Sequence, residues 1–458
     1  MQKIAIYLFR QDLRLEDNPS FSKACANSDF LIPIYCRSTT HQEDTQWGFQ
    51  REGLHRRRFL DDSLKGLSEQ LRLKDSDLFL FEGYINEVLQ SLISFGHIDA
   101  IYCEDIVAPE EQAELKWIRK LGIPVHATWQ SSMIDPEDLP FSAHQMPEQF
   151  TQFRIQIEKR KTLFTSPIPT PQVIPPLPVN LKKDLKSPKS VDVNADVNSN
   201  SDFKAKLVQI EDLDWMGQDS LNAPSSFPYW RDNFRGGELF AKKHLRQYLK
   251  RRLPHSYKKT RNELFGVDYS SKFSPYLANG SLSPRVIMAK LREFENEFGA
   301  NDGSYWLWFE LLWRDYFRIL HLKWGKCLYG VRGLGDALPP QHCQTSFRKW
   351  CLGETGESIV DAGMRELRAT GYLSNRLRQV VASYLIYDLN GDWRAGAAWF
   401  ESQLIDYDVY SNQGNWLYIA GRGTDPRGGR RFNPQKQAND HDSDHSYRSI
   451  WLKNEKYS

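Results

Sequence analysis

Short apolar runs alternate with segments of helical periodicity over the first 130 residues of the chain. Between the runs, Asp17-Asn18-Pro19 is typical of a helix N-terminus, and four leucines from Leu60 to Leu71 recur on one helix face. Strands that alternate with helices form a parallel sheet with helices on both faces. The sequence therefore predicts an α/β domain over residues 1–130, Rossmann-like and doubly wound. The five apolar runs predicted as strands are Ile4–Phe9, Phe30–Tyr35, Asp77–Phe81, Asp99–Tyr102 and Pro124–Ala127.

The remainder of the chain has a different pattern. Residues 165–202 are rich first in Pro and then in Lys, Asp, Asn and Ser, so they have little apolar surface to bury. From about residue 236 the periodicity is helical, and Gly237-Glu238 begins the first helix. We predict an interdomain linker over 131–235 and a large all-α domain over 236–458.

Composition narrows the class of protein. The chain has 458 residues and no apolar run of about 18, so no membrane span is expected. The apolar stretch Ile4–Phe9 is too short for a signal peptide. The six cysteines show no Cys-x-x-Cys or paired metal spacing, which predicts reduced thiols, no metal site and a cytoplasmic location. Of the 14 Trp, eleven lie at or after Trp215, so the second half carries most of the indole rings.

Basic residues gather in two segments although the net charge is only +2. Lys242–Arg261 holds nine Lys and Arg and no acid, and Arg422–Lys436 holds Arg427, Arg430 and Arg431 against the single acid Asp425. Either segment alone is compatible with a solvated helix face. Two such segments on either side of an aromatic-rich region favour binding of a phosphate backbone, and hence of nucleic acid.

A candidate pocket emerges from polar residues next to aromatic ones. Glu310 and Trp313 lie one turn apart in the aromatic run Trp306–Phe317. Core packing explains several of these rings, but an acid beside an aromatic plate can also bind and stack a nucleobase. The serines of Ser270–Pro275 either cap a helix or hold a phosphate. Further polar candidates are Asn375, Arg378 and Gln379 on one predicted helix face, and Asp406, Asp408 and Asn412 in a predicted loop that ends at Trp416.

The opening Phe9–Pro19 resembles that of photolyases and cryptochromes, whereas the segment after the first strand lacks the glycine-rich turn of a dinucleotide fingerprint. The resemblance covers nearly the whole chain apart from the linker. Its other motifs are Ser270–Pro275, Glu310–Asp315, Val360–Arg365, Ser374–Arg376 and Asp406–Trp416. Three segments are similar to the DASH-type cryptochromes of this family: Tyr257–Asn262, Phe309–Tyr316 and Ala420–Asn433.

The resemblance implies a U-shaped FAD in the helical domain. By position, Arg378 and Asp406 match an ion pair over the isoalloxazine ring, Asp408 matches a flavin contact, and Asn412 matches the residue that faces flavin N5. Tyr257 and Arg314 match neighbours of the FAD phosphates. The matching phosphate loop consists of Ser270, Ser271, Lys272, Phe273 and Ser274.

The resemblance also implies a substrate, a pyrimidine dimer flipped into a pocket of Glu310, Trp313 and Asn375. Light-excited reduced flavin would donate an electron that splits the dimer and then returns. Gln379 and Tyr418 replace the Met and second Trp of duplex-acting photolyases, which weakens the grip on a flipped base and predicts a preference for single-stranded DNA. Arg427, Arg430 and Arg431 are the expected DNA contacts. Two alternatives are a blue-light receptor or DNA-binding regulator with little repair, and a nucleic-acid-binding protein without flavin.

Two further expectations follow from the resemblance. Trp416 and Trp393 match the inner and middle members of a three-tryptophan electron relay, but Pro340 stands at the outer position. Trp324 or a tyrosine could take over that role, or photoreduction could be slower. Glu110 best matches the acid that contacts a methenyltetrahydrofolate antenna, with Glu111 as the second candidate, although acids that begin a helix are also ordinary partners of the helix dipole. The protein is expected to be a monomer.

Overall fold

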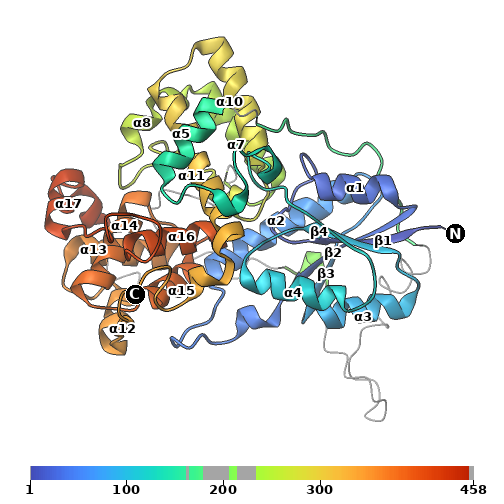
Figure 1. Ribbon diagram of the computed structural model, residues 1–458, viewed down its shortest axis with the longest axis horizontal. Helices are drawn as coiled ribbons and strands as arrows, with labels where there is room; N and C mark the ends of the chain where they lie inside the picture. The colour runs from blue at the N-terminus through green and yellow to red at the C-terminus, as the bar shows by residue number, and fades with distance from the viewer. Residues whose placement is uncertain (1, 161–163, 179–205, 214–233, 453–458) are drawn as a thin grey trace, which may run out of the picture.

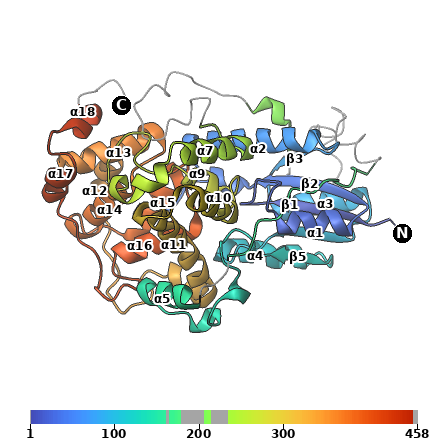
Figure 2. The same cartoon turned by 90° about the horizontal axis from the view of Figure 1, so that it is seen from above.

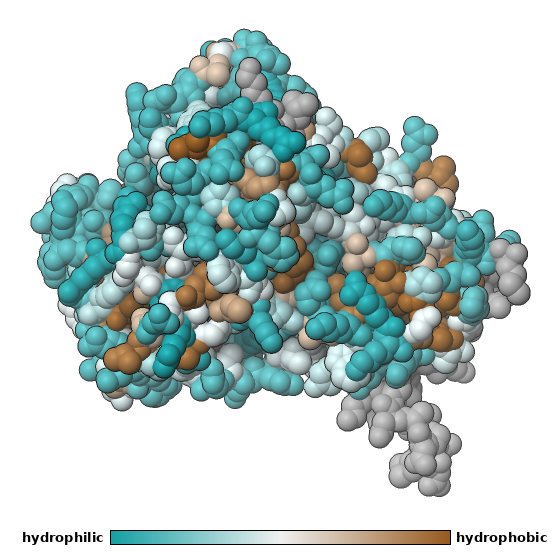
Figure 3. Space-filling model, viewed as in Figure 1, coloured by the Kyte–Doolittle hydropathy of each residue, from teal (hydrophilic) through white to brown (hydrophobic). Residues whose placement is uncertain are grey.

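The computed structural model describes residues 2–160, 164–178, 206–213 and 234–452. In Figures 1 and 2 an α/β domain lies beside a larger helical domain. Much of the predicted linker, residues 179–205 and 214–233, falls outside the described residues. No helix of the described part is long and apolar enough to cross a membrane. Figure 3 shows that hydrophilic residues cover most of one face, with separate smaller hydrophobic areas.

The α/β domain is built on a six-stranded sheet with the order β5-β4-β1-β2-β3-β6. The first five strands are parallel and overlap the five predicted apolar runs, with ends that differ by one or two residues in all but β1, which confirms the predicted strands. β6 (Lys206–Val208) was not predicted, because three residues carry no periodic signal; it pairs antiparallel to β3 at the sheet edge. The parallel strands are β1 (Ile4–Phe9), β2 (Phe30–Arg37), β3 (Phe79–Glu82), β4 (Ala100–Glu104) and β5 (Val125–Thr128).

Both faces of the sheet are covered by helices, as a doubly wound fold requires. Ile6 and Leu8 point into the core beneath α3 (Ile85–Phe95) and α4 (Pro109–Arg119), whereas Tyr7 and Phe9 point to the opposite core beneath α1 (Pro19–Asn27) and α2 (Leu54–Arg72). The predicted start of α1 is confirmed, because the Asn18 side chain accepts a hydrogen bond from the Phe21 amide at 3.0 Å.

The described residues from 234 to 452 form helices joined by turns and loops, without a strand, which confirms the predicted all-α domain. α11 is its longest helix, and a capping box of Asn301 and Ser304 fixes its start. The helices are α7 (Glu238–Lys250), α8 (Tyr257–Thr260), α9 (Ser274–Ala278), α10 (Pro284–Phe298), α11 (Asp302–Trp324), α12 (Gln344–Leu352), α13 (Ser358–Thr370), α14 (Asn375–Ser383), α15 (Trp393–Gln403), α16 (Val409–Ile419), α17 (Pro434–His441) and α18 (Ser446–Leu452).

Part of the segment predicted as linker is packed structure. α5 (Phe150–Arg160) lies against α11, and the Phe150 ring stacks on Trp313 at 3.7 Å. Upstream of α5, the Met133 and Ile134 amides both donate to the Asp315 carboxylate. These contacts attach residues 131–160 to the helical domain, and the exact domain boundaries stay predictions.

The prediction of a loop over Asp406–Trp416 is wrong from Asp408 onward, because Asp408 caps a helix that begins at Val409. The Asp408 carboxylate accepts a hydrogen bond from the Ser411 amide at 2.8 Å and caps α16 (Val409–Ile419). Core residues occur on several sides of this helix, among them Tyr410, Trp416 and Leu417. A helix buried in this way shows no clear apolar stripe, and its sequence therefore resembles a loop.

Candidate functional site

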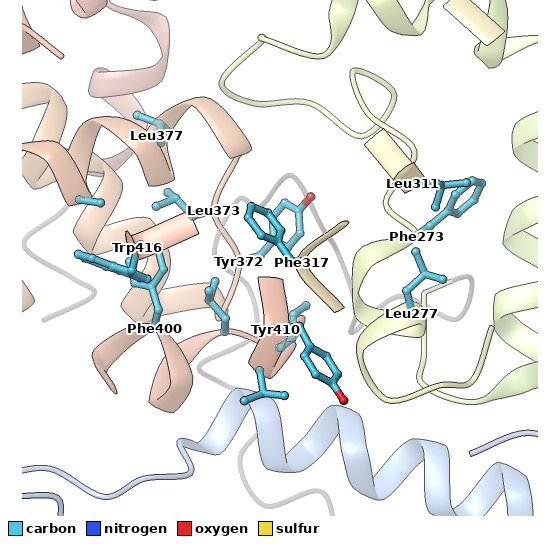
Figure 4. Close-up of a cluster of buried hydrophobic side chains, with 14 of the residues drawn as sticks. Phe273, Leu277, Leu311, Phe317, Tyr372, Leu373, Leu377, Phe400, Tyr410 and Trp416 are labelled. Carbon is cyan, nitrogen blue, oxygen red and sulfur yellow. The ribbon is translucent and has the colours of Figure 1, made fainter. Parts of the chain in front are cut away.

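The helical domain encloses a cavity of about 430 Å³, here called the flavin-site cavity. Its walls come from the turn before α9 and from α11, α14 and α16. Figure 4 shows the buried apolar cluster of this region, in which the cavity-lining Phe317 and Tyr372 lie between Phe273 on one side and Trp416 on the other. Most of the predicted site residues line this one cavity: Tyr257, Ser270, Ser271, Lys272, Phe273, Ser274, Glu310, Trp313, Arg314, Asn375, Arg378, Gln379, Asp406, Asp408, Tyr418 and Arg430.

The segment Ser270–Ser274, which leads into α9 and is here called the serine turn, is held in shape from outside the cavity. His244 Nε2 lies 2.7 Å from the Ser271 carbonyl oxygen, and the Thr260 hydroxyl donates to the Tyr269 carbonyl at 2.7 Å. Lys272 adopts a left-handed φ of 56° and is only 1 % exposed. Its Nζ lies 3.3 Å from the centre of the Tyr269 ring and has no hydrogen-bond partner, and burial holds the pKa of this amine well below its ordinary value.

An ion pair fixes the wall opposite the turn. Arg378 Nη2 donates to both Asp406 oxygens at 3.0 and 2.8 Å, and Arg378 Nε donates to the Leu373 carbonyl. The pair joins α14 to the segment before α16 and places a fixed cation and anion beside the cavity. This is the pairing that the sequence implied.

Asp408 and Arg314 form a second charged group. Their atoms Oδ2 and Nη2 are 3.7 Å apart, and Asp408 Oδ2 has no hydrogen bond within the described chain. Burial and the nearby Arg318 lower the pKa of Arg314 to about 10. Although burial opposes it, the two arginines hold the pKa of Asp408 below its ordinary value. Asp408 is thus an anion with an unused acceptor in the cavity wall.

Asn412 lines a smaller cavity of about 90 Å³ that shares Arg378, Asp406 and Asp408 with the flavin-site cavity. It lies one turn after Asp408 on α16, and its Nδ2 donates to the Ala397 carbonyl at 3.0 Å. Trp416 lines the same small cavity. The amide of Asn412 is therefore oriented by the backbone of α15.

The predicted base pocket forms one end of the flavin-site cavity. Glu310 pairs with Arg261 at 2.5 Å, and burial raises the pKa of the Glu310 carboxyl group. Trp313 stacks on Phe150 and meets Tyr418 edge to face at 5.6 Å. Arg261, which lies in the first basic segment and in the motif Tyr257–Asn262, was not predicted from the sequence as a member of this pocket.

The three predicted arginine contacts differ in position. Arg427 and Arg431 are surface side chains, 70 % and 66 % exposed. Arg430 instead lines the flavin-site cavity, donates to Asp425 at 3.0 Å and to the Tyr418 hydroxyl, and lies over the Tyr418 ring. Its place beside Tyr418 makes Arg430 part of the pocket wall rather than of an open basic face.

The tryptophans of the expected relay are both buried. Trp393 donates to the Val331 carbonyl at 3.3 Å, and Trp416 meets Phe400 at 5.1 Å. The Trp416 ring also contacts Trp350 edge to face at 6.4 Å, a neighbour to which the sequence gave no role. Pro340 lies in a segment without helix or strand before α12.

A second cavity, of about 670 Å³, lies where the carboxyl ends of β1 and β2 face the helical domain, and is here called the strand-end cavity. Glu110 lines it, but its side chain is 69 % exposed and pairs with Arg51 at 2.6 Å. Arg51 also pairs with Glu401 of α15 at 2.7 Å. The rule that ligands bind beyond the carboxyl ends of parallel strands could have located this cavity from the sequence.

Comparison with known proteins gives the same two parts. Residues 306–456 match the FAD binding domain of DNA photolyase, and residues 5–173 match DNA photolyase. A cryptochrome DASH of Idiomarina loihiensis is 39 % identical over 452 residues, which is 98 % of this chain and 92 % of that protein. The chain belongs to the cryptochrome DASH family of the photolyase/cryptochrome superfamily.

Solved structures of the superfamily agree with this fold. The crystal structure of a Synechocystis cryptochrome has a TM-score of 0.85 and 37 % identity, and the match covers 98 % of this chain and 88 % of that one. An archaeal photolyase from Sulfolobus tokodaii with two FAD molecules has a TM-score of 0.72 and 25 % identity over 98 % of this chain and 90 % of that one. The matched FAD binding domain begins within α11 and includes α12–α18, whereas the serine turn precedes it.

Proposed function

We propose that this cryptochrome DASH repairs cyclobutane pyrimidine dimers in DNA, preferentially in single strands, with FAD in the flavin-site cavity. The observation that carries the proposal is the meeting of two residue sets in one cavity. The serine turn and the Arg378–Asp406 pair, which would hold the cofactor, share it with Glu310 and Trp313, which would hold a base.

The residues present fit FAD. Lys272 Nζ and Asp408 Oδ2 are buried polar atoms without hydrogen bonds, and buried groups of this kind normally have partners. FAD carries both an anionic diphosphate and hydroxyl and N–H donors, the two kinds of partner that these atoms lack. When bound in its reduced form, FAD supplies the electron that light delivers to the dimer.

The walls of the base pocket support the single-strand preference. Arg376 donates to Gln379 at 3.2 Å, and Arg430 donates to Tyr418. The side chains of Gln379 and Tyr418 are therefore polar and already hydrogen-bonded. Flipping a dimer out of duplex DNA costs a few kcal/mol, which single-stranded DNA largely avoids. A pocket with polar, occupied walls has less stacking energy with which to offset that cost.

The test is repair by the reduced, flavin-loaded protein under blue light. One oligonucleotide with a single thymine dimer is used as a single strand and as an annealed duplex, and dimer loss is followed by recovery of absorbance. We expect the single strand to be repaired several-fold faster. Equal rates would contradict the preference, and DNA binding with little repair of either substrate would favour the light-receptor or regulator hypothesis.

DNA binding is supported by the exposed side chains of Arg427 and Arg431. Each pairs with an acid, Arg427 with Asp425 and Arg431 with Asp388, and both remain open to solvent. Alanine at each position should weaken DNA binding and reduce its salt dependence, as loss of a phosphate contact does. The protein is also proposed to act in the reducing cytoplasm, in keeping with its six free cysteines, and as a monomer.

The electron relay is proposed to begin at Trp416 and continue through Trp393. Indole is the side chain best suited to carry an electron hole between buried sites, and both rings are buried. Trp393→Phe should slow light-driven reduction of the bound flavin in a flash-absorption measurement, whereas Trp451→Phe, in α18, should not. Normal-speed photoreduction in Trp393→Phe would refute this path.

We also propose that the strand-end cavity holds an antenna, 5,10-methenyltetrahydrofolate, with Glu110 at its mouth. The cavity is within the usual size range of small-molecule sites, roughly 300–1,000 Å³. The archaeal photolyase with two FAD molecules offers a flavin as the competing ligand class.

A further inference from the structure

A chain of aromatic rings leads from the buried Trp416 to a partly exposed indole of the α/β domain. The ring of Trp416 lies 6.4 Å from that of Trp350, and Trp350 stacks on Phe347 at 5.9 Å. The His342 ring lies 5.3 Å from Phe347 and 4.8 Å from Trp47. Trp350 and Trp416 are buried, whereas Trp47, in the segment between β2 and α2, is only half-buried. The rings therefore connect the core of the helical domain with solvent.

Trp47 also lies beside the position at which the expected electron relay is incomplete. His342 follows two residues after Pro340, which stands where the outer tryptophan was expected. The guanidinium of Arg394, the residue after Trp393, lies 6.0 Å from the centre of the Trp47 ring. An indole from a distant part of the sequence thus borders both the segment that lacks the outer tryptophan and the residue next to the middle one.

The indole N–H of Trp47 is more accessible than those of the buried rings. Among the described residues no acceptor meets Trp47 Nε1, and this atom is not buried. Trp350 and Trp393 are buried, and their indoles donate to backbone carbonyls at 2.9 and 3.3 Å. An indole that has lost an electron is strongly acidic at its N–H, so Trp47 can release a proton to water. The Arg394 cation favours this release, because it disfavours a positive charge on the ring.

Trp324, the other indole considered for the outer position, lacks these features. Its Nε1 is buried and has no hydrogen-bond partner within the described chain, so it has no acceptor for a proton. No ring contact among the described residues joins Trp324 to Trp393 or Trp416. Trp47 therefore fits the outer position better than Trp324.

We propose that Trp47 is the outer, solvent-side member of the electron relay, and that Trp350 connects it to Trp416 alongside Trp393. This inference rests on the proposed function, because it assumes FAD in the flavin-site cavity and a relay that begins at Trp416. Phe347 and His342 fill the space between the two indoles, where packed rings give the electron a short path without being oxidised themselves.

Each step of the relay transfers one electron. Trp416 gives an electron to light-excited oxidised FAD and takes one from Trp350 or Trp393. That ring takes an electron from Trp47, which then releases its N–H proton to water. A thiol in solution restores Trp47 by donating one electron and one proton, and two thiols oxidised in this way form a disulfide. The net electron therefore comes from the thiol.

The test locates the indole radical in the full chain loaded with oxidised FAD, with dithiothreitol as the thiol. Transient absorption after a laser flash gives the lifetime of the radical, and a nitroso spin trap followed by peptide mass spectrometry gives its position. Wild type is compared with Trp47→Phe and with Trp117→Phe, whose indole is 59 % exposed but lies outside the ring chain.

We expect the spin trap to label Trp47 in wild type and in Trp117→Phe. In Trp47→Phe the radical should decay several-fold faster, because the buried rings keep their protons and the electron returns to them. The Trp47 side chain makes no hydrogen bond with the described residues, so FAD content and thermal midpoint should not change in this variant.

A second pair of variants tests the connection through Trp350. Trp350→Phe and Phe347→Leu should each lower the label at Trp47 several-fold. Trp350→Phe also removes the donor to the Val381 carbonyl. If that variant does not fold, Phe347→Leu tests the same connection, because it removes a ring and keeps an apolar side chain in the core.

Several results would overturn the inference. Labelling of Trp324 in place of Trp47, or an unchanged radical lifetime in Trp47→Phe, would refute the role of Trp47. Full labelling of Trp47 in both Trp350→Phe and Phe347→Leu would refute the connection through Trp350. A wild type that binds FAD but forms no indole radical would refute the relay as a whole. Dimer repair by protein reduced chemically with dithionite needs no relay, so its absence would count against the proposed function alone.

Discussion

Burial and charge pairing act in opposite directions on individual ionisable residues around the flavin-site cavity. Burial raises the pKa of Glu310, whereas Arg314 and Arg318 hold the pKa of Asp408 below its ordinary value although Asp408 is the less exposed of the two side chains. The two acids therefore have different characters. Asp408 is a permanent acceptor, and Glu310 depends on Arg261 for its charge.

Removing the charge of Glu310 should weaken substrate binding. Glu310→Gln keeps the shape of the side chain and loses the carboxylate that a base would meet, so affinity for dimer-containing single strands should fall by roughly tenfold or more. FAD content should not change. Glu354→Gln, at an exposed position, is the matched control. Unchanged affinity, measured by fluorescence anisotropy, would remove Glu310 from the pocket assignment.

His321 should make stability depend on pH. Its Nδ1 lies 2.7 Å from the Phe317 carbonyl oxygen and its Nε2 3.1 Å from the Tyr329 hydroxyl, and burial lowers its pKa from 6.5 to about 4. The unfolded chain therefore binds a proton more readily than the folded one. The stability contribution is fully present above pH 6.5 and is lost as pH falls towards 4.

The size of this effect follows from the shift. One pKa unit corresponds to about 1.4 kcal/mol, so the loss for this residue should be on the order of 3 kcal/mol. His321→Asn should reduce the pH dependence of the thermal midpoint over this range. His97→Asn should leave that dependence unchanged, because the His97 side chain is 80 % exposed. An unaltered slope in His321→Asn would assign the pH dependence to other groups.

At the scale of elements, small residues decide how closely the helices around the cavity approach. A Cβ at Gly414 of α16 would lie 2.1 Å from Phe317 of α11, and one at Gly396 of α15 would lie 2.1 Å from Trp416. These glycines let aromatic rings pack directly on helix backbones. The positions of Asn412 and Trp416 thus depend on neighbours that have no polar chemistry.

Gly414→Ala should destabilise the protein although alanine favours helices. The helix propensity gain is about 1 kcal/mol, whereas overpacking of a core costs about 1–3 kcal/mol. We expect a lower thermal midpoint and weaker FAD retention, because α16 must move away from α11. Gly330→Ala is the control, since a Cβ there would meet its nearest atom at 3.6 Å. Increased stability of Gly414→Ala would show that the helices can readjust freely.

At the scale of the whole molecule, buried polar contacts join the two domains. Glu238, the first residue of α7, accepts hydrogen bonds from the Leu15 and Glu16 amides of the α/β domain at 2.8 and 3.1 Å. Arg285 of α10 pairs with Asp17 at 2.8 Å and donates to its carboxylate. The strand-end cavity has walls from both domains, so its shape depends on these contacts.

Glu238→Ala should weaken the domain junction. It leaves the buried Leu15 amide and the half-buried Glu16 amide without an acceptor, and an unsatisfied buried group costs about 1–3 kcal/mol. We expect a lower thermal midpoint and reduced binding of methenyltetrahydrofolate in the strand-end cavity, with Glu293→Ala on the exposed face of α10 as the control. Wild-type stability in Glu238→Ala would mean that other contacts hold the domains in place.

Local patterns in the sequence determined much of this protein. The five parallel strands, the start of α1 and the succession of helices follow from apolar periodicity and capping residues, which act over a few neighbours. The motifs also identified most residues of the flavin-site cavity, because chemically distinctive side chains such as those of Ser270–Ser274 keep their spacing along the chain.

Only the tertiary structure decided which distant residues meet. The sequence pattern did not predict α16, because a helix that is buried on several sides lacks the single apolar stripe by which helices are predicted. Arg261 and Glu310 lie far apart in sequence and form an ion pair. Arg430, which was predicted as a DNA contact, turns inward beside Tyr418. No local pattern in the sequence encodes either contact. Glu52 is the clearest case, because an acid flanked by Arg51 and Gly53 looks solvated in the sequence. Its burial becomes visible only when the fold places it in the wall between the two domains, where neither carboxylate oxygen has a hydrogen-bond partner.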